Sequence, residues 1–413
     1  MIWPGDPGDP GLLSGMPSSM ARALADAGVQ VTPVWDASTA PVGPGALPRV
    51  RTLMPDSTWR AGARARRGVR AAWELACPGL ARAAMLARAR AGAEAIARRL
   101  RAIEHDVVFG CCISSLLAFL DHDRPIVYYS DATARVINTT YPVYAARPHA
   151  YHEACDEFER RALARASRCA FASREVLRSA IDDYALPPER GSVIPLGANV
   201  VPENPLAIVI PAPPPTREDF RLCMVAADPV RKRLDLAVSI VEELVRRGWR
   251  ARLSVIGPLT PCASRSGVVD HLGRLRLGVA SDLERHRRVL ERSHLLLLPS
   301  LGEAFGIAPC EAAHFGRPSL VSDAGGLPSA VLDGVTGMVL PVNAPAGAYA
   351  DAAEGLAASP ARYASMSLAA AERARRELTW EAWAGSVRGL LESVPTATIA
   401  PCTRPGLAQR PAS

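Results

Sequence analysis

Short apolar segments of strand length alternate with longer helix-type segments along most of this chain, and the alternation restarts near residue 220. In the first half, strand-type segments are Val29–Val34, Val107–Gly110, Ile126–Tyr129, Cys169–Ala172 and Val193–Pro195, with helical patterns at Ser18–Ala27 and His149–Ala166. In the second half they are Phe220–Ala226, Leu253–Ile256, Leu295–Leu298, Ser319–Val321 and Met338–Leu340, with a helical pattern at Leu234–Arg247. Such alternation predicts an α/β protein with parallel sheets that helices cover on both faces.

A proline-rich segment, residues 200–219, separates the two series of elements. Clustered prolines do not fit the interior of a helix or a central strand, so this segment predicts an interdomain linker. We therefore predict two doubly wound domains, residues 1–199 and 220–376, that face each other across a cleft. In such sheets ligands bind at the carboxyl ends of the strands. Only Met1–Trp3 are available for a first strand, so we expect that strand to be very short or the true start to lie upstream.

The composition of the chain excludes several classes of protein. Hydrophobic residues make up 49% of its 413 residues and charged residues 22%, which predicts a folded chain with buried cores. No apolar run has the length of a transmembrane segment, and the N-terminus has no secretory signal pattern. The nine cysteines and the histidines show no metal-ligand spacing. We therefore predict a cytoplasmic protein with reduced cysteines and no bound metal. Cys111 and Cys112 lie in a strand-type run and should face opposite ways.

Arginine supplies nearly all of the positive charge in a chain of formal net charge +7. Basic residues concentrate in the helix-type stretch 60–101, for which a solvated face is the first interpretation and weak peripheral membrane contact the alternative. Few aromatic residues interrupt this stretch, which argues against nucleic acid binding. Lys232 is the only lysine in the sequence. That isolation makes Lys232 a candidate functional residue.

The strongest chemical signal lies in residues 295–341. A buried strand leads into the loop Gly302–Gly306 and then into a helix. Small residues let backbone amides approach a ligand, and a helix N-terminus carries a partial positive charge that suits a phosphate. Glu303 in the loop and Glu311 in the helix have seven residues between them, and carboxylates accept hydrogen bonds from sugar hydroxyls. Taken singly, a helix-capping role for Glu303 and a helix-dipole role for Glu311 are the simpler interpretations.

Taken together, these residues resemble the family-4 retaining glycosyltransferases, which have the GT-B fold of two Rossmann-like domains facing across a cleft. The matching positions are Glu303, Phe305, Gly306, Ile307, Glu311 and Ala312, followed by Gly325–Pro328 and Asp333–Gly337. The resemblance implies an acceptor-side domain at 1–199 and a nucleotide-sugar-binding domain at 220–376. A helix at 377–393 would cross back to the first domain, and the composition of 394–413 predicts a disordered tail.

The resemblance also implies the parts of a donor site. Glu303 would contact the donor sugar, and Glu311 would hold the ribose hydroxyls. The backbone amides that would face the sugar and diphosphate are those of Ala304, Phe305, Gly306 and Ile307. Lys232 would bind the diphosphate, as a lysine does in the corresponding loop of the family. The family's G-R pair before this lysine is not matched, which leaves Arg231 or Arg233 as the second cation.

Two further candidates lie in the N-terminal domain. Gly15, before a helix, resembles the glycine loop that faces the donor phosphates, although an ordinary helix start explains it equally well. Asp131 belongs to Tyr129–Thr133, which resembles an S-D-A-T subgroup of the family. At the end of a strand that faces the cleft, Asp131 would orient the acceptor or the transferring sugar, and a helix-capping role is the alternative.

The implied reaction moves a sugar from a nucleotide-diphosphate donor, with UDP favoured, to an acceptor hydroxyl with retention at the anomeric carbon. Glu303, Asp131 and Lys232 are the predicted catalytic residues, and the nucleotide sugar is a co-substrate rather than a bound cofactor. A natural product such as an aminocyclitol, a glycan precursor and a lipid remain open as acceptors. The alternatives are an epimerase or phosphorylase of the same fold, or an inactive nucleotide-sugar-binding protein. A phosphorylase is disfavoured because the sequence has no lysine suited to a pyridoxal cofactor.

Overall fold

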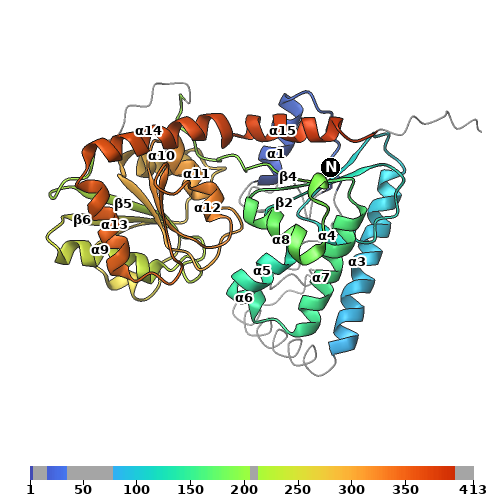
Figure 1. The fold of residues 1–413 in the computed structure, drawn as a ribbon, viewed down its shortest axis with the longest axis horizontal. Helices are drawn as coiled ribbons and strands as arrows, with labels where there is room; N and C mark the ends of the chain where they lie inside the picture. Colours follow the sequence, from blue (N-terminus) through green and yellow to red (C-terminus); the bar gives the residue numbers. More distant parts are fainter. Residues whose placement is uncertain (3–15, 35–77, 205–212, 396–413) are drawn as a thin grey trace, which may run out of the picture.

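Two lobes, each built on a parallel sheet, make up the computed structural model, which describes residues 1–2, 16–34, 78–204 and 213–395. Figure 1 shows the C-terminal lobe on the left and the N-terminal lobe on the right, with α14 and α15 running along the top of both. The prediction of an α/β protein with two parallel sheets is confirmed. The position of Gly15 and the first part of the basic stretch 60–101 lie outside the described residues.

The sheet of the N-terminal lobe has the order β1-β2-β3-β4, with every pair parallel. Its strands are β1 (Val108–Cys111), β2 (Ile126–Ser130), β3 (Arg168–Phe171) and β4 (Gly191–Val193). Its helices are α1 (Met16–Asp26), α3 (Pro78–Leu100), α4 (Ser114–Leu117), α5 (Ala134–Thr140), α6 (Pro142–Ala145), α7 (His149–Arg165) and α8 (Arg174–Tyr184). The predicted strands therefore lie within a few residues of the observed ones from β1 to β4.

The expected strand Val29–Val34 is an exception. Within the described residues, this segment pairs only at Val34, which forms an isolated parallel bridge with Ile2. Ile2 also bridges Gly110 of β1, so it lies between Val34 and β1. Residues 29–33 form no strand, so the predicted strand is wrong in extent, although Thr32 and Val34 each share one backbone hydrogen bond with Met1.

The sheet of the C-terminal lobe has the order β10-β9-β8-β5-β6-β7 and is also parallel throughout. Its strands are β5 (Phe220–Val225), β6 (Ala251–Ile256), β7 (Val269–Gly273), β8 (Leu295–Leu298), β9 (Ser319–Ser322) and β10 (Gly337–Leu340). Its helices are α9 (Leu234–Arg246), α10 (Ala280–Arg292), α11 (Ile307–His314), α12 (Leu327–Ala330), α13 (Ala346–Ala357) and α14 (Pro360–Glu377). Figure 1 shows α10 and α11 above this sheet and α9 below it.

The central strand β8 shows why the sequence folds in this way. Its four residues are all leucine and all buried, as expected for a strand with helices on both faces. The first helix of the lobe, α9, buries Ala237, Ile240, Val241 and Leu244, which recur at helical spacing. Gly248 follows α9 with a φ of +88°, a conformation that glycine adopts without steric cost.

The last helix, α15 (Trp380–Glu392), packs against α1 of the N-terminal lobe. Trp383 is buried and meets Phe109 and Tyr129 edge-on, with ring centroids 6.2 and 5.5 Å apart. The indole nitrogen of Trp380 donates to the side-chain oxygen of Asn199 over 3.0 Å. The last helix of the chain therefore lies on the N-terminal lobe (Figure 1).

Candidate functional site

The loop between β8 and α11 lies at the carboxyl edge of the C-terminal sheet. Gly306 has a φ of +104°, and this left-handed residue lets the chain enter α11 directly. Two more glycines brace the loop from the β9–α12 turn. A Cβ at Gly325 would lie 1.9 Å from the Glu303 carbonyl oxygen, and one at Gly326 would lie 2.2 Å from that of Ala304. The glycines of the predicted motif therefore serve close backbone packing that fixes the loop.

Glu303 is the electrostatic centre of this loop. Its side chain is buried, and its Oε1 accepts a hydrogen bond from the Ser300 hydroxyl over 3.0 Å. The same oxygen lies 3.0 Å from Nη1 of Arg231 and 3.3 Å from Nζ of Lys232. Burial alone would raise the pKa of Glu303, but the two cations outweigh burial and hold this pKa below its usual value. Glu303 is therefore a carboxylate at neutral pH.

The turn between β5 and α9 supplies both cations. The Asp228 carboxylate accepts from the Arg231 amide over 3.1 Å, and the Asp228 carbonyl accepts from the Lys232 amide over 3.0 Å. Arg231 also donates to the Gly302 carbonyl. Arg233 instead donates to the carbonyl of Val342. Of the two arginines considered for the second cation, the structure brings Arg231 to Glu303.

Glu311 lies on α11 and is buried on all sides. Backbone amides of Asn199 and Val200, at the end of the N-terminal lobe, hydrogen-bond its carboxyl group. Burial raises the pKa of Glu311 to about 8, although Lys232 and these amides act in the opposite direction. His286 of α10 places its Nε2 3.9 Å from Oε2 of Glu311. Among the described residues this Nε2 has no hydrogen-bond partner, and burial lowers the pKa of His286 to about 4.

Asp131 follows β2 directly and belongs to the N-terminal lobe. Its Oδ1 accepts from the Cys112 thiol over 3.5 Å. Burial raises the pKa of Asp131, and the negative charge of Glu303 adds to this rise. The capping residue of α5 is Thr133, whose side chain accepts from the amide of Val136. The alternative role of Asp131 as the helix cap is therefore wrong.

The cysteine pair next to Asp131 also differs from expectation. Strand β1 ends at Cys111, and Cys112 adopts a φ of +53°. This turn brings the two sulfur atoms to 3.8 Å instead of placing them on opposite faces. The expectation of opposite faces was wrong because the strand stops one residue early.

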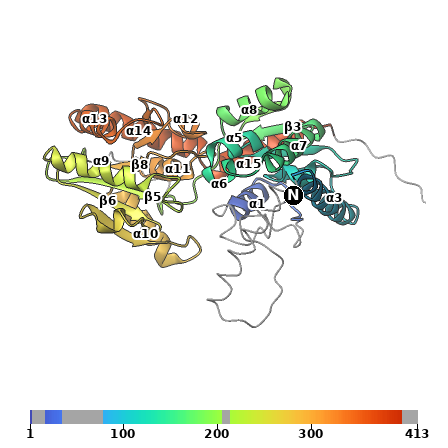
Figure 2. The ribbon, with the colours of Figure 1, turned by 90° about the horizontal axis from the view of Figure 1, so that it is seen from below.

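The helical hairpin α5–α6 of the N-terminal lobe reaches the loop Gly302–Gly306. In both views it lies on the side of that lobe that faces the C-terminal lobe (Figures 1 and 2). The Tyr141 hydroxyl accepts from the Ala304 amide over 2.9 Å. The guanidinium of Arg231 lies 4.7 Å from the centroid of the Tyr141 ring. Sequence reasoning missed Tyr141, because nothing in its neighbourhood shows which segment of the other lobe it meets.

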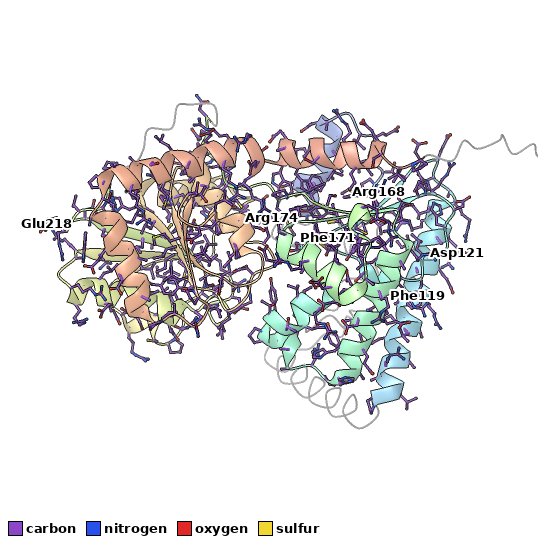
Figure 3. The ribbon with its side chains drawn as sticks, in the orientation of Figure 1. Phe119, Asp121, Arg168, Phe171, Arg174 and Glu218 are labelled. Carbon is purple, nitrogen blue, oxygen red and sulfur yellow. The ribbon has the colours of Figure 1, made fainter. Side chains whose placement is uncertain are left out.

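A second contact joins the lobes at the start of α8. The Ser329 hydroxyl accepts from the Arg174 amide over 3.1 Å and donates to the Glu175 carboxylate over 2.6 Å. Figure 3 labels Arg174 at the junction of the two lobes. Both contacts hold the lobes together around the loop that carries Glu303.

The described residues contain neither a metal-type cluster nor a membrane-spanning helix. In that part of the chain, no three His, Cys, Asp or Glu side chains gather in a way that could hold a metal ion. No helix there combines the length and the apolar character needed to cross a bilayer.

Both halves of the chain match known families. Residues 18–201 match the family described as Glycosyltransferase Family 4, and residues 219–359 match Glycosyl transferases group 1. The structure is similar to sucrose-phosphate synthase from Thermosynechococcus elongatus, with a TM-score of 0.63, 18% identity and coverage of 95% of this chain and 97% of that one. The chain has the GT-B fold. The GT-B likeness extends to WaaG, a glycosyltransferase involved in lipopolysaccharide biosynthesis, with a TM-score of 0.53, 16% identity and coverage of 91% and 95%.

The GT-B chain also has sequence relatives. A D-inositol 3-phosphate glycosyltransferase of Nocardia farcinica is 28% identical over 299 residues, which cover 68% of this chain and 64% of the relative. A protein of the same description from Streptomyces bingchenggensis is 33% identical over 158 residues, or 35% of this chain and 34% of that one. The similarity therefore spans less than two thirds of each of these relatives.

Proposed function

We propose that this chain transfers a sugar from a nucleotide-diphosphate donor to an acceptor hydroxyl. The observation that carries the proposal is the convergence of Lys232 and Arg231 on Glu303, in a loop that leads into the N-terminus of α11. Cations beside a helix N-terminus suit a diphosphate, whose charge persists through transfer of the sugar. The matches of both halves to glycosyltransferase families support the same class of reaction.

Each residue has a distinct role in this proposal. Lys232 and Arg231 bind the diphosphate, which replaces part of their attraction to Glu303. Glu303 is then free to accept hydrogen bonds from the hydroxyls of the donor sugar. The backbone amides of residues 305–307 face the sugar and the diphosphate. Glu311, near the end of the N-terminal lobe, holds the ribose hydroxyls.

The proposed reaction retains the anomeric configuration. The bond between the anomeric carbon and the diphosphate oxygen breaks, and the acceptor oxygen forms its bond to that carbon on the same face. The departing diphosphate takes the acceptor proton, so no protein nucleophile is needed. Asp131, on the N-terminal lobe, orients the acceptor or the transferring sugar. Protein cations and amides neutralise the leaving group in this proposal, without a metal ion.

The acceptor and the place of action also belong to the proposal. The relatives named after D-inositol 3-phosphate make a cyclitol one reasonable acceptor class, beside glycan precursors and lipids. We propose a cytoplasmic enzyme with UDP as the favoured nucleotide. Weak membrane contact through the basic 60–101 stretch, of which α3 is the described part, remains a hypothesis.

Incubation of the purified chain with UDP-, GDP-, ADP- and dTDP-sugars, with and without cyclitol acceptors, tests the function. We expect release of the nucleoside diphosphate and formation of a new glycoside with unchanged anomeric configuration. NMR spectroscopy of the product reports that configuration. Conversion of the donor sugar into an epimer without acceptor would favour the epimerase alternative. Nucleotide binding without any conversion would favour the inactive binding protein.

A further inference from the structure

Tyr141 is a residue of the N-terminal lobe inserted into the predicted donor loop of the C-terminal lobe. Its hydroxyl accepts the Ala304 amide proton over 2.9 Å, and its ring lies under the Arg231 guanidinium at 4.7 Å. The preceding residue adds a third contact, because a Cβ at Gly302 would lie 2.5 Å from the Thr140 carbonyl oxygen. Only glycine at position 302 allows this approach. Two contacts therefore meet this loop directly, and the third reaches it through Arg231, which donates to the Gly302 carbonyl.

Two carboxyl groups act on the Tyr141 hydroxyl, Glu303 from the C-terminal lobe and Asp131 from the N-terminal lobe. Burial raises the pKa of Tyr141, and the negative charges of Glu303 and Asp131 raise it further. The phenol therefore keeps its proton at neutral pH. The hydrogen bond to the Ala304 amide, next to Glu303 in the chain, places the hydroxyl beside the proposed sugar-binding carboxylate.

Arg231 links Tyr141 to the diphosphate-binding group. The guanidinium that stacks on the Tyr141 ring lies 3.0 Å from Glu303 and donates to the Gly302 carbonyl. An aromatic face attracts a guanidinium and restricts the positions that it samples. The Tyr141 ring thus holds Arg231 in the orientation in which it meets Glu303.

We propose that Tyr141 is a positioning residue that sets the donor loop for sugar transfer when the two lobes are closed; this inference rests on the proposed function. Its hydroxyl fixes the Ala304 amide, which leaves the amides of residues 305–307 to face the donor. Its ring fixes Arg231 beside Lys232 and Glu303. Tyr141 therefore couples closure of the lobes to the geometry of the donor site, and it acts through these residues rather than on the sugar.

The variants Tyr141→Phe and Tyr141→Leu separate the two contacts, and Tyr144→Phe is the matched control. Phenylalanine removes the hydroxyl and keeps the ring, whereas leucine removes both. Tyr144 lies on helix α6, which Tyr141 precedes, and its ring centroid is 6.3 Å from that of Tyr141. Amide hydrogen exchange of segment 301–307 in the ligand-free chain is measured first. Both Tyr141 variants should exchange faster than the wild type, and Tyr144→Phe should not.

The second measurement is UDP release from UDP-glucose, with water as the acceptor. Tyr141→Phe should lower kcat by about fivefold with little change in KM, since one neutral hydrogen bond is lost. Tyr141→Leu should lower kcat by roughly a further fivefold as the stacking on Arg231 disappears. Tyr141→Phe should therefore keep a higher kcat than Tyr141→Leu at a similar KM. A tyrosine that only stabilised the fold would not give this graded loss of kcat.

Exchange rates of segment 301–307 that are the same in all four proteins would overturn the proposal. A rise in KM with unchanged kcat would also overturn it, because Tyr141 would then serve binding alone. If the wild type releases no UDP, the proposed function fails for this donor. The exchange measurement then still decides whether Tyr141 holds the loop, so the two failures are distinguishable.

Discussion

The Nζ atom of Lys232 lies 3.3 Å from Oε1 of Glu303, although the two residues come from different strand-to-helix connections of the C-terminal lobe. Parallel strands β5 and β8 are neighbours in the sheet, and their carboxyl ends therefore bring these connections together. The pair joins the predicted phosphate-binding cation to the predicted sugar-binding carboxylate. In the proposed reaction, the donor inserts its diphosphate and sugar at this pair.

Removal of the Lys232 charge should weaken nucleotide binding. A charge-assisted contact contributes about 1.5–3 kcal/mol, so Lys232→Ala should lower UDP affinity by roughly 10- to 100-fold in isothermal titration calorimetry. Arg250→Ala is the matched control. Arg250 is exposed and precedes β6, so it lies at the amino ends of the strands, whereas Lys232 follows the carboxyl end of β5. Equal UDP affinity in Lys232→Ala and the wild type would exclude Lys232 from the phosphate site.

The two glutamates of the motif should separate nucleotide from sugar recognition. Glu311→Ala should weaken UDP and UDP-glucose alike, because Glu311 is assigned to the ribose. Glu303→Ala should spare UDP, because its loss frees Lys232 and Arg231 for phosphate, but it should weaken UDP-glucose. Titration of both ligands into both variants gives the comparison. If the two variants lose the same ligands to the same extent, the division of roles is wrong.

Glu311 should make stability depend on pH. Burial raises its pKa to about 8 in the folded chain, against about 4.3 for an unfolded glutamate. A carboxyl group with a raised pKa contributes stability that is complete below the unfolded pKa and is lost as pH rises through about 8. The wild type should therefore lose more thermal stability than Glu311→Gln between about pH 6 and about pH 9. Melting curves that fall in parallel would contradict the raised pKa.

A side chain at position 302 should separate the lobes. The added Cβ of Gly302→Ala would meet the Thr140 backbone oxygen at 2.5 Å, and a backbone atom has no room to rotate away. We expect a larger radius of gyration in small-angle X-ray scattering and slower donor turnover. Gly355→Ala is the control, because a Cβ there meets nothing within 4 Å and lies in α13. An unchanged radius of gyration in Gly302→Ala would show that the loop moves instead of the lobes.

The sequence predicted the parts of the fold that depend on local pattern. Four consecutive leucines made β8 clear, and β9 and β10 follow it with similar patterns. Strand β7 was missed, because Asp270 and His271 give it the polar character of a strand at the edge of the sheet. Burial on both faces, which produces an apolar run, is absent at such an edge.

In the candidate site, the sequence likewise predicted the residues of the motif but not the contacts between the lobes. The motif brought Glu303, Lys232 and Arg231 into one hypothesis, and the structure places them within hydrogen-bonding or ion-pair distance. Contacts between the lobes were not predictable, among them Tyr141 on Ala304 and the amides of residues 199–200 on Glu311. These contacts depend on how two separately folded lobes meet, and no periodicity or spacing in the sequence records that arrangement.

The most direct test of the account is thermal unfolding of the purified chain in the presence of UDP, GDP, ADP or dTDP. A ligand that binds only the folded state stabilises it by about 2.7 kcal/mol at roughly one hundred times its Kd. One of these nucleotides, with UDP favoured, should raise the unfolding temperature of the wild type and not that of Lys232→Ala. No shift with any of the four, or an equal shift in the variant, would contradict a nucleotide-diphosphate site at Lys232.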